Sequence, residues 1–104
     1  MEAKIKLTED FKEEAQEIYD YIYHVLKNPQ ASKKLRKRVV ERINNLKHFP
    51  KMYKKIKKKD KLKRHYRRIV IDNYIILYSL DEIKNIVYVT HIYYGKRNYI
   101  ENLL

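Results

Sequence analysis

The chain has 104 residues, no cysteine and a formal net charge of +12 at pH 7. This length predicts a single domain spanning residues 1–104, and the lack of cysteine excludes disulfides, thiolate zinc sites and a cysteine nucleophile. An apolar content of 44% favours a folded protein over a disordered one. The first ten residues contain no apolar signal segment, and no run approaches eighteen apolar residues, so we expect a soluble, cytoplasmic protein.

The N-terminal quarter of the chain predicts a strand followed by a helix. Residues 3–7, AKIKL, alternate in polarity as a short strand does. Thr8 is a candidate N-cap, and acidic residues follow in what would be the first turn. Apolar side chains then recur at steps of three and four from Phe11 to Val25, which predicts an amphipathic helix ending near Lys27.

A second helix is predicted directly after the first. Asn28 is suited to the N-cap and Pro29 to the first helical position. A further apolar stripe runs from Leu35 to Leu46 and ends before Pro50. Because the link between the two helices is short, we expect an antiparallel helical hairpin.

The C-terminal half predicts three strands. The segments YRRIVID, YIILYSL and NIVYVTHIYY are rich in Ile, Val and Tyr, and short polar turns separate them. Three consecutive strands with short turns form an antiparallel meander. The predicted order is therefore β-α-α-β-β-β, an α+β domain with an antiparallel sheet and the N-terminal helical hairpin packed on one face.

One segment carries most of the net charge. Residues 51–68, KMYKKIKKKDKLKRHYRR, contain eleven Lys or Arg and one Asp, so they hold +10 of the +12. Such a field attracts polyanions, namely nucleic acid, anionic lipid or an acidic protein, although a solvated charge run is the plainer alternative. Six tyrosines fall in the predicted strands, and an open sheet face with aromatic rings and a cationic rim suits single-stranded RNA. Ordinary packing is the alternative for each tyrosine.

The carboxylates gather in the first helix, TEDFKEEAQE, where a cap and a solvated face account for them. The chain has no P-loop, no GxGxxG motif and no serine triad. We therefore expect neither a metal nor a nucleotide cofactor.

These elements together resemble the toxins of the RelE/ParE superfamily, small basic proteins of type II toxin-antitoxin systems. INNLKHFP resembles the family's leucine-then-Phe-Pro stop, and YRRIVIDNYIILYSLDE resembles its arginine-bearing strand and the tyrosine-containing strand that follows. IVYVTHIYYGKRNY resembles its last strand, which ends in Gly-x-Arg-x-Tyr. The resemblance covers nearly the whole chain and implies a cognate acidic antitoxin as partner.

The resemblance implies one of two activities. RelE-like members cut mRNA in the ribosomal A site, whereas ParE-like members inhibit DNA gyrase without cutting RNA. We expect a ribosome-dependent mRNA endonuclease, with the ribosome and mRNA as partners, because the charge of residues 51–68 suits docking onto ribosomal RNA. Gyrase inhibition, favoured by the long helical hairpin and the shortage of standard catalytic residues, is the alternative, and a non-toxic nucleic-acid-binding module is a third.

The resemblance also suggests site residues. Arg97 matches the arginine after the family's glycine, which stabilises phosphate charge in ribonuclease members, and Tyr99 loosely matches an aromatic residue beyond it. Arg67 matches the arginine of the first meander strand, and its planar fork suits phosphate. A structural ion pair of Arg67 with Asp72 or Glu82 is the alternative.

Cleavage without a metal needs proton transfer and stabilisation of the phosphorane charge. His91 or Tyr99 is the candidate for proton transfer, with a buried or merely surface-lying histidine as the alternative for His91. Gly95, the single glycine, would permit a positive φ and aim Lys96 and Arg97 over the open sheet face. The candidate contacts to the RNA backbone are Lys58, Lys59, Lys61, Arg64 and Lys96.

Three departures from the family pattern bear on a nuclease mechanism. Tyr94 precedes the glycine where the family often has His. Ile75 or Ile76 stands where some RNA-cutting members carry a cation, and His91 stands where many relatives carry Arg.

Overall fold

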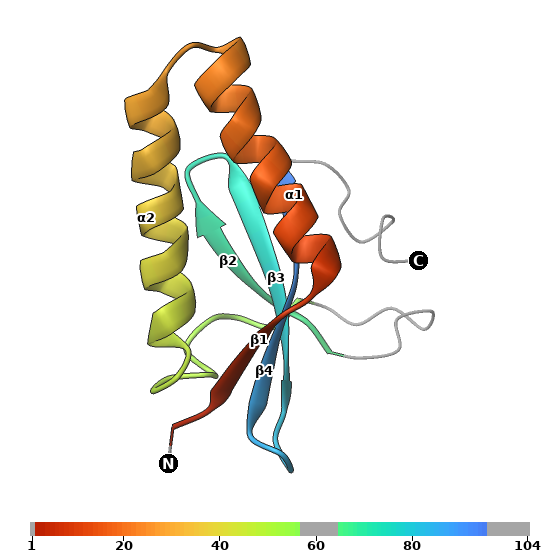
Figure 1. The fold of residues 1–104 in the computed structure, drawn as a ribbon. Coiled ribbons are helices and arrows are strands. Elements are labelled where there is room, and N and C mark those ends of the chain that lie inside the picture. Colours follow the sequence, from red (N-terminus) through yellow and green to blue (C-terminus); the bar gives the residue numbers. More distant parts are fainter. Residues whose placement is uncertain (1, 57–64, 96–104) are drawn as a thin grey trace.

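The computed structural model describes residues 2–56 and 65–95 and has the predicted order of elements (Figure 1). Two helices and four strands follow one another as expected, and a π-helical segment at Tyr21–Val25 extends the first helix. The elements are β1 (Lys4–Leu7), α1 (Glu9–Asp20), α2 (Pro29–Asn45), β2 (Arg67–Ile71), β3 (Tyr74–Asp81) and β4 (Ile86–Tyr94). No helix of residues 2–56 and 65–95 is both long enough and apolar enough to cross a membrane.

Side chains define where both helices begin. The Thr8 hydroxyl accepts a hydrogen bond from the Phe11 N–H at 3.2 Å, and the Asn28 side-chain oxygen accepts one from the Ala31 N–H at 3.1 Å. Each bond satisfies a backbone donor that the helix itself leaves unpaired. Lys27 adopts a positive φ of 52° between the two helices, and both predicted N-caps are confirmed.

The sheet has the strand order β1-β4-β3-β2. The meander of β2, β3 and β4 is antiparallel as predicted, but β1 pairs parallel with β4, from Lys4 opposite Ile86 to Leu7 opposite Val89. The α+β class is confirmed, with a mixed sheet in place of a wholly antiparallel one. Two helices separate β1 from the meander, so no hairpin turn dictates an antiparallel partner for it.

A β-bulge interrupts the pairing of β3 with β4. Leu77 pairs with His91 whereas Tyr78 pairs with Val89, so Thr90 is an extra residue in β4. The Thr90 hydroxyl donates to the Leu77 carbonyl at 3.2 Å and is thereby satisfied within the buried bulge. Since strand side chains alternate between faces, the extra residue turns His91 onto the face opposite Val89.

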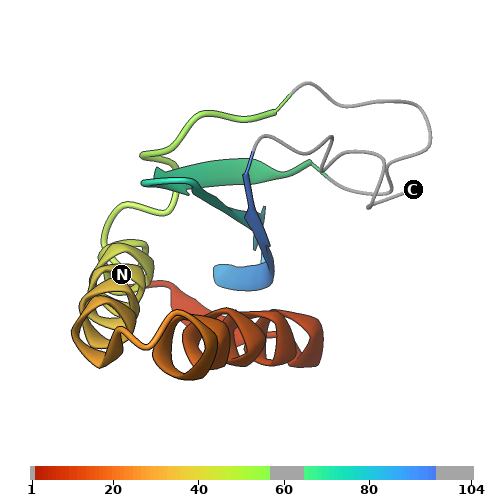
Figure 2. The ribbon, with the colours of Figure 1, turned by 90° about the horizontal axis from the view of Figure 1, so that it is seen from above.

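Both helices cover the same face of the sheet (Figure 2). The core forms between this face and the apolar stripes predicted from the sequence. Its members include Phe11, Ala15, Leu35, Val39 and Ile43 from the helices and Ile69, Ile71, Ile76, Tyr78, Val87, Val89 and Ile92 from the strands. The alternate positions of β2 and β3, such as Arg68, Val70 and Leu77, therefore belong to the face turned away from the helices, which we call the open face. Arg68 and Val70 are exposed on it, whereas Leu77 is 0% exposed and therefore covered.

Replacing Ile76 by Ala tests this arrangement of the core. Ile76 is 0% exposed, so we expect the substitution to lower the free energy of unfolding by about 2–5 kcal/mol, through lost apolar burial and the cavity left behind. The same change at Ile83, which is 98% exposed in the turn between β3 and β4, is expected to stay within about 0.5 kcal/mol of the parent. Urea unfolding of both variants measures the difference, and equal effects would contradict the assigned core.

Gly95 ends β4 with a backbone conformation that favours glycine. Its φ is +80°, and its N–H donates to the Asn73 carbonyl in the neighbouring turn. Among the described residues, no atom lies within 4 Å of the position that a Cβ would occupy, so the demand for glycine is conformational. The predicted positive φ is confirmed, whereas the residues that it was expected to aim, Lys96 and Arg97, lie outside the described residues.

Gly95→Ala therefore isolates a backbone effect. We expect it to lower the free energy of unfolding by about 1–2 kcal/mol, because an L side chain is strained in the left-handed region. Gly95→Asn is expected to cost less, since asparagine tolerates that region better. Chemical denaturation provides the measurement, and an unchanged Gly95→Ala protein would show that the positive φ is not required.

Candidate functional site

Two of the residues predicted to act in catalysis, Arg67 and His91, lie in the described part of the chain. They lie on different strands, β2 and β4, with β3 between them. The remaining predicted site residues lie outside the described residues: Lys58, Lys59, Lys61, Arg64, Lys96, Arg97 and Tyr99.

The guanidinium of Arg67 is engaged with the segment that precedes β2. Its Nη1 donates to the carbonyl of Tyr53 at 2.8 Å and lies 3.4 Å from that of Lys51. The two acidic residues suggested as alternative partners of Arg67 pair with other cations, Asp72 with Arg38 and Glu82 with Lys51. In this arrangement Arg67 stabilises the segment around Lys51 and Tyr53 beside β2. A role for Arg67 in catalysis stays a prediction.

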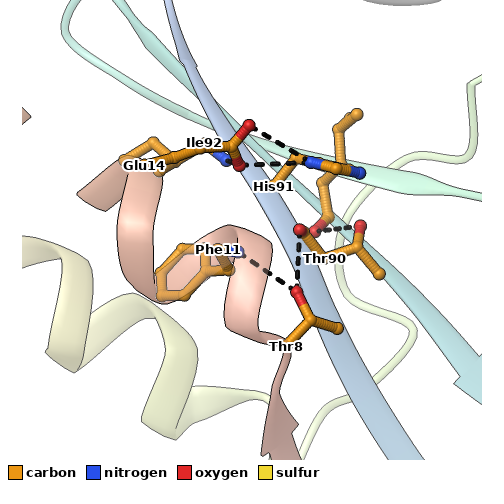
Figure 3. A network of polar contacts seen from close by, with 7 residues as sticks. Thr8, Phe11, Glu14, Thr90, His91 and Ile92 are labelled. Carbon is orange, nitrogen blue, oxygen red and sulfur yellow. Dashed lines mark hydrogen bonds and ion pairs between the residues drawn. The ribbon is translucent and has the colours of Figure 1, made fainter. Parts of the chain in front are cut away.

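His91 lies at the edge of β4 against helix α1 (Figure 3). Its Nδ1 atom is 3.1 Å and 3.3 Å from the two carboxylate oxygens of Glu14. The ring also stacks on Tyr93, with centroids 5.3 Å apart and planes inclined by 13°. The imidazole is thus held from two sides, with its side chain 20% exposed.

Glu14 reaches this edge because β1 is shorter than β4. The parallel pairing stops at Leu7 and Val89, and Thr8 caps α1, so the second half of β4 is paired with β3 on one side and has no strand on the other. The Thr8 hydroxyl donates to the Thr90 carbonyl at 2.9 Å, and the Ile92 N–H donates to Glu14 at 3.3 Å. These side chains satisfy edge groups that a further strand would otherwise pair.

Burial and charge act in opposite directions on Glu14. Desolvation raises the pKa of its carboxyl, while the neighbouring His91 and the Ile92 N–H favour the ionised form. Asp10 adds a further upward shift because two negative charges repel. The net effect is a pKa above the ordinary value for glutamate, which the two partners at β4 partly offset by favouring the carboxylate.

The strand pairing brings an arginine into line with His91. Arg68 on β2 pairs with Leu77 on β3, and Leu77 pairs with His91 on β4, so the three residues form one cross-strand row. Arg68 is exposed and was missed in the sequence analysis, which singled out Arg67. The sequence does hold a signal for Arg68, because side chains alternate between the two faces along a strand. With Ile69 buried against the helices, Arg67 shares its face and Arg68 lies on the open face.

The tyrosines of the strands divide between the two faces. Tyr78, expected on the open face, is fully buried in the core, where its hydroxyl donates to the Pro50 carbonyl at 2.9 Å. Tyr74 packs against the same core and lies next to Tyr94, with ring centroids 5.3 Å apart. Tyr93 belongs to the open face, since its partner Ile75 alternates with the core residue Ile76.

The described site has the groups for acid-base chemistry and anion binding. Within residues 2–56 and 65–95, no group of three His, Cys, Asp or Glu side chains is placed to hold a metal ion. The chemistry on offer is instead an imidazole in contact with a carboxylate, an arginine in the same row, and an aromatic ring. Proton transfer and stabilisation of a phosphate are within reach of such a set.

A family model decides the relationship of this chain to known proteins. The model described as "ParE toxin of type II toxin-antitoxin system, parDE" matches residues 5–99. The chain belongs to the ParE toxin family. No curated protein sequence matches the chain.

Solved structures show that the ParE-family chain shares its fold with other toxins. One neighbour belongs to the chromosomal ParDE system of P. aeruginosa, with a TM-score of 0.69, 14% identity, and coverage of 90% of this chain and 97% of that one. A chain of the archaeal RelE-RelB complex from Pyrococcus horikoshii OT3 has a TM-score of 0.63 and 16% identity, and the match covers 93% of this chain and 99% of that one. A chain of the toxin-antitoxin complex RelBE2 from Mycobacterium tuberculosis has a TM-score of 0.62 and 15% identity. The match covers 90% of this chain and 99% of that one.

The pKa of Tyr93 predicts a pH dependence of the stability of this ParE-family toxin. Burial raises the pKa to about 12, and the nearby acidic groups of Glu14 and Asp10 contribute. An unfolded tyrosine titrates near 10, so the resulting stabilisation is complete below about pH 10 and is lost as the pH rises through 12. We expect Tyr93→Phe to make the free energy of unfolding fall less steeply over this range.

Urea unfolding at a series of alkaline pH values measures that slope. Tyr23→Phe, at an exposed tyrosine of the helical hairpin, is the matched control and should keep the parent slope. A Tyr93→Phe protein with the parent's slope would show that this hydroxyl does not titrate as described.

Proposed function

We propose that this ParE-family toxin blocks translation by cutting mRNA on the ribosome. The observation that carries the proposal is the open-face row, in which an exposed arginine, Arg68, and the imidazole of His91 flank a single strand. Two inter-strand spacings separate them, roughly 10 Å between Cα atoms. Leu77, which lies between them on β3, is 0% exposed, so in this proposal a ribose-phosphate unit contacts the two side chains from either side of a covered strand position.

The proposed reaction needs no group beyond water and the side chains at hand. The His91 imidazole takes the proton of a ribose 2′-hydroxyl, and the 2′-oxygen attacks the adjacent phosphorus. The bond from phosphorus to the 5′-oxygen breaks, that oxygen takes a proton from water, and the His91 imidazolium returns its proton to the hydroxide so formed. The products are a 2′,3′-cyclic phosphate and a 5′-hydroxyl. Arg68 stabilises the negative charge that builds on the phosphorane.

The charge of residues 51–68 supports an RNA target. Its +10 favours docking on the dense polyanion of the ribosome, and the Tyr93 ring offers a face on which a base can stack. As part of the proposal, Arg97 contacts the phosphate and Tyr99 assists proton transfer. The backbone contacts assigned to Lys58, Lys59, Lys61, Arg64 and Lys96 belong to the same proposal.

We further propose that an acidic antitoxin neutralises the protein. The structural neighbours from P. horikoshii and M. tuberculosis were solved as toxin-antitoxin complexes. A groove of about 540 Å³ between α1, α2 and β1 has an apolar floor that includes Phe11 and Val39, and Lys12, Arg36 and Lys47 also line it. An amphipathic segment with acidic side chains complements such a groove.

Inhibition of DNA gyrase is the second candidate. The match of residues 5–99 to the ParE family favours it, since the resemblance implies gyrase as the target of ParE-like members. The contacts of Arg67 with backbone carbonyls also favour it, because they use the arginine that the family resemblance assigns to phosphate. Supercoiling by purified gyrase in the presence of the toxin tests this candidate directly.

A purified translation system with a defined mRNA tests the nuclease. We expect new 5′ ends in frame with codons only when ribosomes are present, and a loss of about 10²- to 10⁴-fold in cleavage rate for His91→Gln, the range that general acid-base catalysis contributes. His48→Gln, at an exposed histidine beyond α2, is the control and should cleave like the parent. An intact message together with blocked supercoiling would replace the nuclease by the gyrase proposal.

A further inference from the structure

We propose that Glu14 is a positioning residue, which holds His91 in the tautomer that carries its proton on Nδ1 and leaves Nε2 as the reacting nitrogen. This inference deepens the proposed nuclease function and rests on it. The family resemblance assigned no role to the first helix in catalysis. The assignment comes instead from the contact that α1 makes with the edge of β4 (Figure 3).

The tautomer follows from the chemistry of the two partners. An ionised carboxylate can only accept hydrogen bonds, so the ring nitrogen facing it must carry a hydrogen. Both carboxylate oxygens of Glu14 lie within 3.3 Å of His91 Nδ1. In the neutral ring Nε2 is then the atom with a lone pair, and it is the one able to accept a proton from substrate.

The carboxylate is itself held in place. Its Oε1 atom accepts from the Ile92 N–H at 3.3 Å, next to the His91 contact on the same stretch of β4. That N–H belongs to the unpaired edge of the strand, so Glu14 is tied to backbone and does not merely follow the imidazole. With 28% of its side chain exposed, Glu14 is largely shielded from competing water.

A second contact fixes the plane of the imidazole. The ring lies almost parallel to Tyr93, two residues further along β4 on the open face, with centroids 5.3 Å apart. Stacking limits rotation about the side-chain bonds, and the contact with Glu14 selects which nitrogen faces α1. The two together leave Nε2 on the side of the ring away from Glu14.

The same carboxylate has a role as the reaction proceeds. When Nε2 takes the 2′-hydroxyl proton, the ring becomes an imidazolium with both nitrogens protonated. A carboxylate already bonded to Nδ1 stabilises that positive charge without rearrangement, which lowers the barrier for the chemical step. Loss of Glu14 should therefore reduce kcat and leave KM unchanged.

The first measurement needs no variant. Long-range proton–nitrogen NMR correlations on 15N-labelled protein report which ring nitrogen of each histidine carries the hydrogen, and His91→Gln identifies the His91 signals. At a pH where the ring is neutral, we expect the Nδ1–H tautomer to predominate at His91. A predominant Nε2–H tautomer would overturn the inference, whether or not the protein cuts RNA.

The second measurement compares two neutralised glutamates on α1. Glu14→Gln keeps a similar shape and the oxygen that faces both the Ile92 N–H and His91 Nδ1, so it should keep the tautomer and, having lost the charge, lower kcat by roughly 10- to 100-fold. Glu14→Ala removes both acceptor oxygens and should abolish the tautomer preference as well. Glu13→Gln removes the same charge at the adjacent exposed position and should leave the tautomer, kcat and KM unchanged. Glu14→Asp, whose shorter side chain cannot span from α1 to both partners, provides a second test if Glu14→Gln folds poorly.

The outcomes separate the two proposals. A Glu14→Ala protein that keeps the Nδ1–H tautomer, or that loses it and still cleaves at the parent rate, overturns the positioning role. Should the parent cut no message while its tautomer depends on Glu14, the nuclease proposal fails and the structural assignment of His91 stands.

Discussion

The extra residue in β4 is the constraint on which the site depends. Without the bulge at Thr90, simple alternation would align His91 with Val87 and Val89 and direct it into the core. Because Thr90 is left out of the pairing, the strand continues beyond the bulge with Ile92 in the core and His91 on the open face. The buried hydrogen bond from the Thr90 hydroxyl to the Leu77 carbonyl stabilises the irregular pairing. The contacts of His91 with Glu14 and Tyr93 follow from this one insertion.

Much of the fold could be predicted because its signals are local. Thr8 and Asn28 cap helices through their own side chains, and apolar stripes spaced at three and four residues mark the buried faces of both helices. The pairing of β1 with β4 could not be predicted in the same way, since it joins segments some eighty residues apart with no turn between them. Parallel direction and strand order depend on how the helical hairpin packs, and no short stretch of sequence encodes that.

The site was less accessible to sequence reasoning than the fold. His91 was identified as a candidate, but Glu14 was explained as part of a solvated helix face, because nothing in TEDFKEEAQE distinguishes it from its acidic neighbours. Its contacts with His91 and Ile92 form only when α1 is placed beside the edge of β4. The preference for Arg67 over Arg68 had a different origin, since the family resemblance outweighed the alternation that places Ile69 in the core. For Tyr78, burial in the core overrode the expectation of an aromatic open face.

The parallel pairing of the first strand with the last has a consequence for how the toxin is synthesised. Residues 4–7 find their neighbours only at residues 86–89, and Glu14 meets His91 across 77 positions of sequence. Contacts of this separation cost more loop-closure entropy than local ones, and they cannot form before β4 has been synthesised. A ribosome that is still making the protein thus carries a chain in which the proposed site has not yet been assembled. On the proposed mechanism, a polypeptide that stops short of β4 is inert, and the translating ribosome is spared until synthesis is nearly complete.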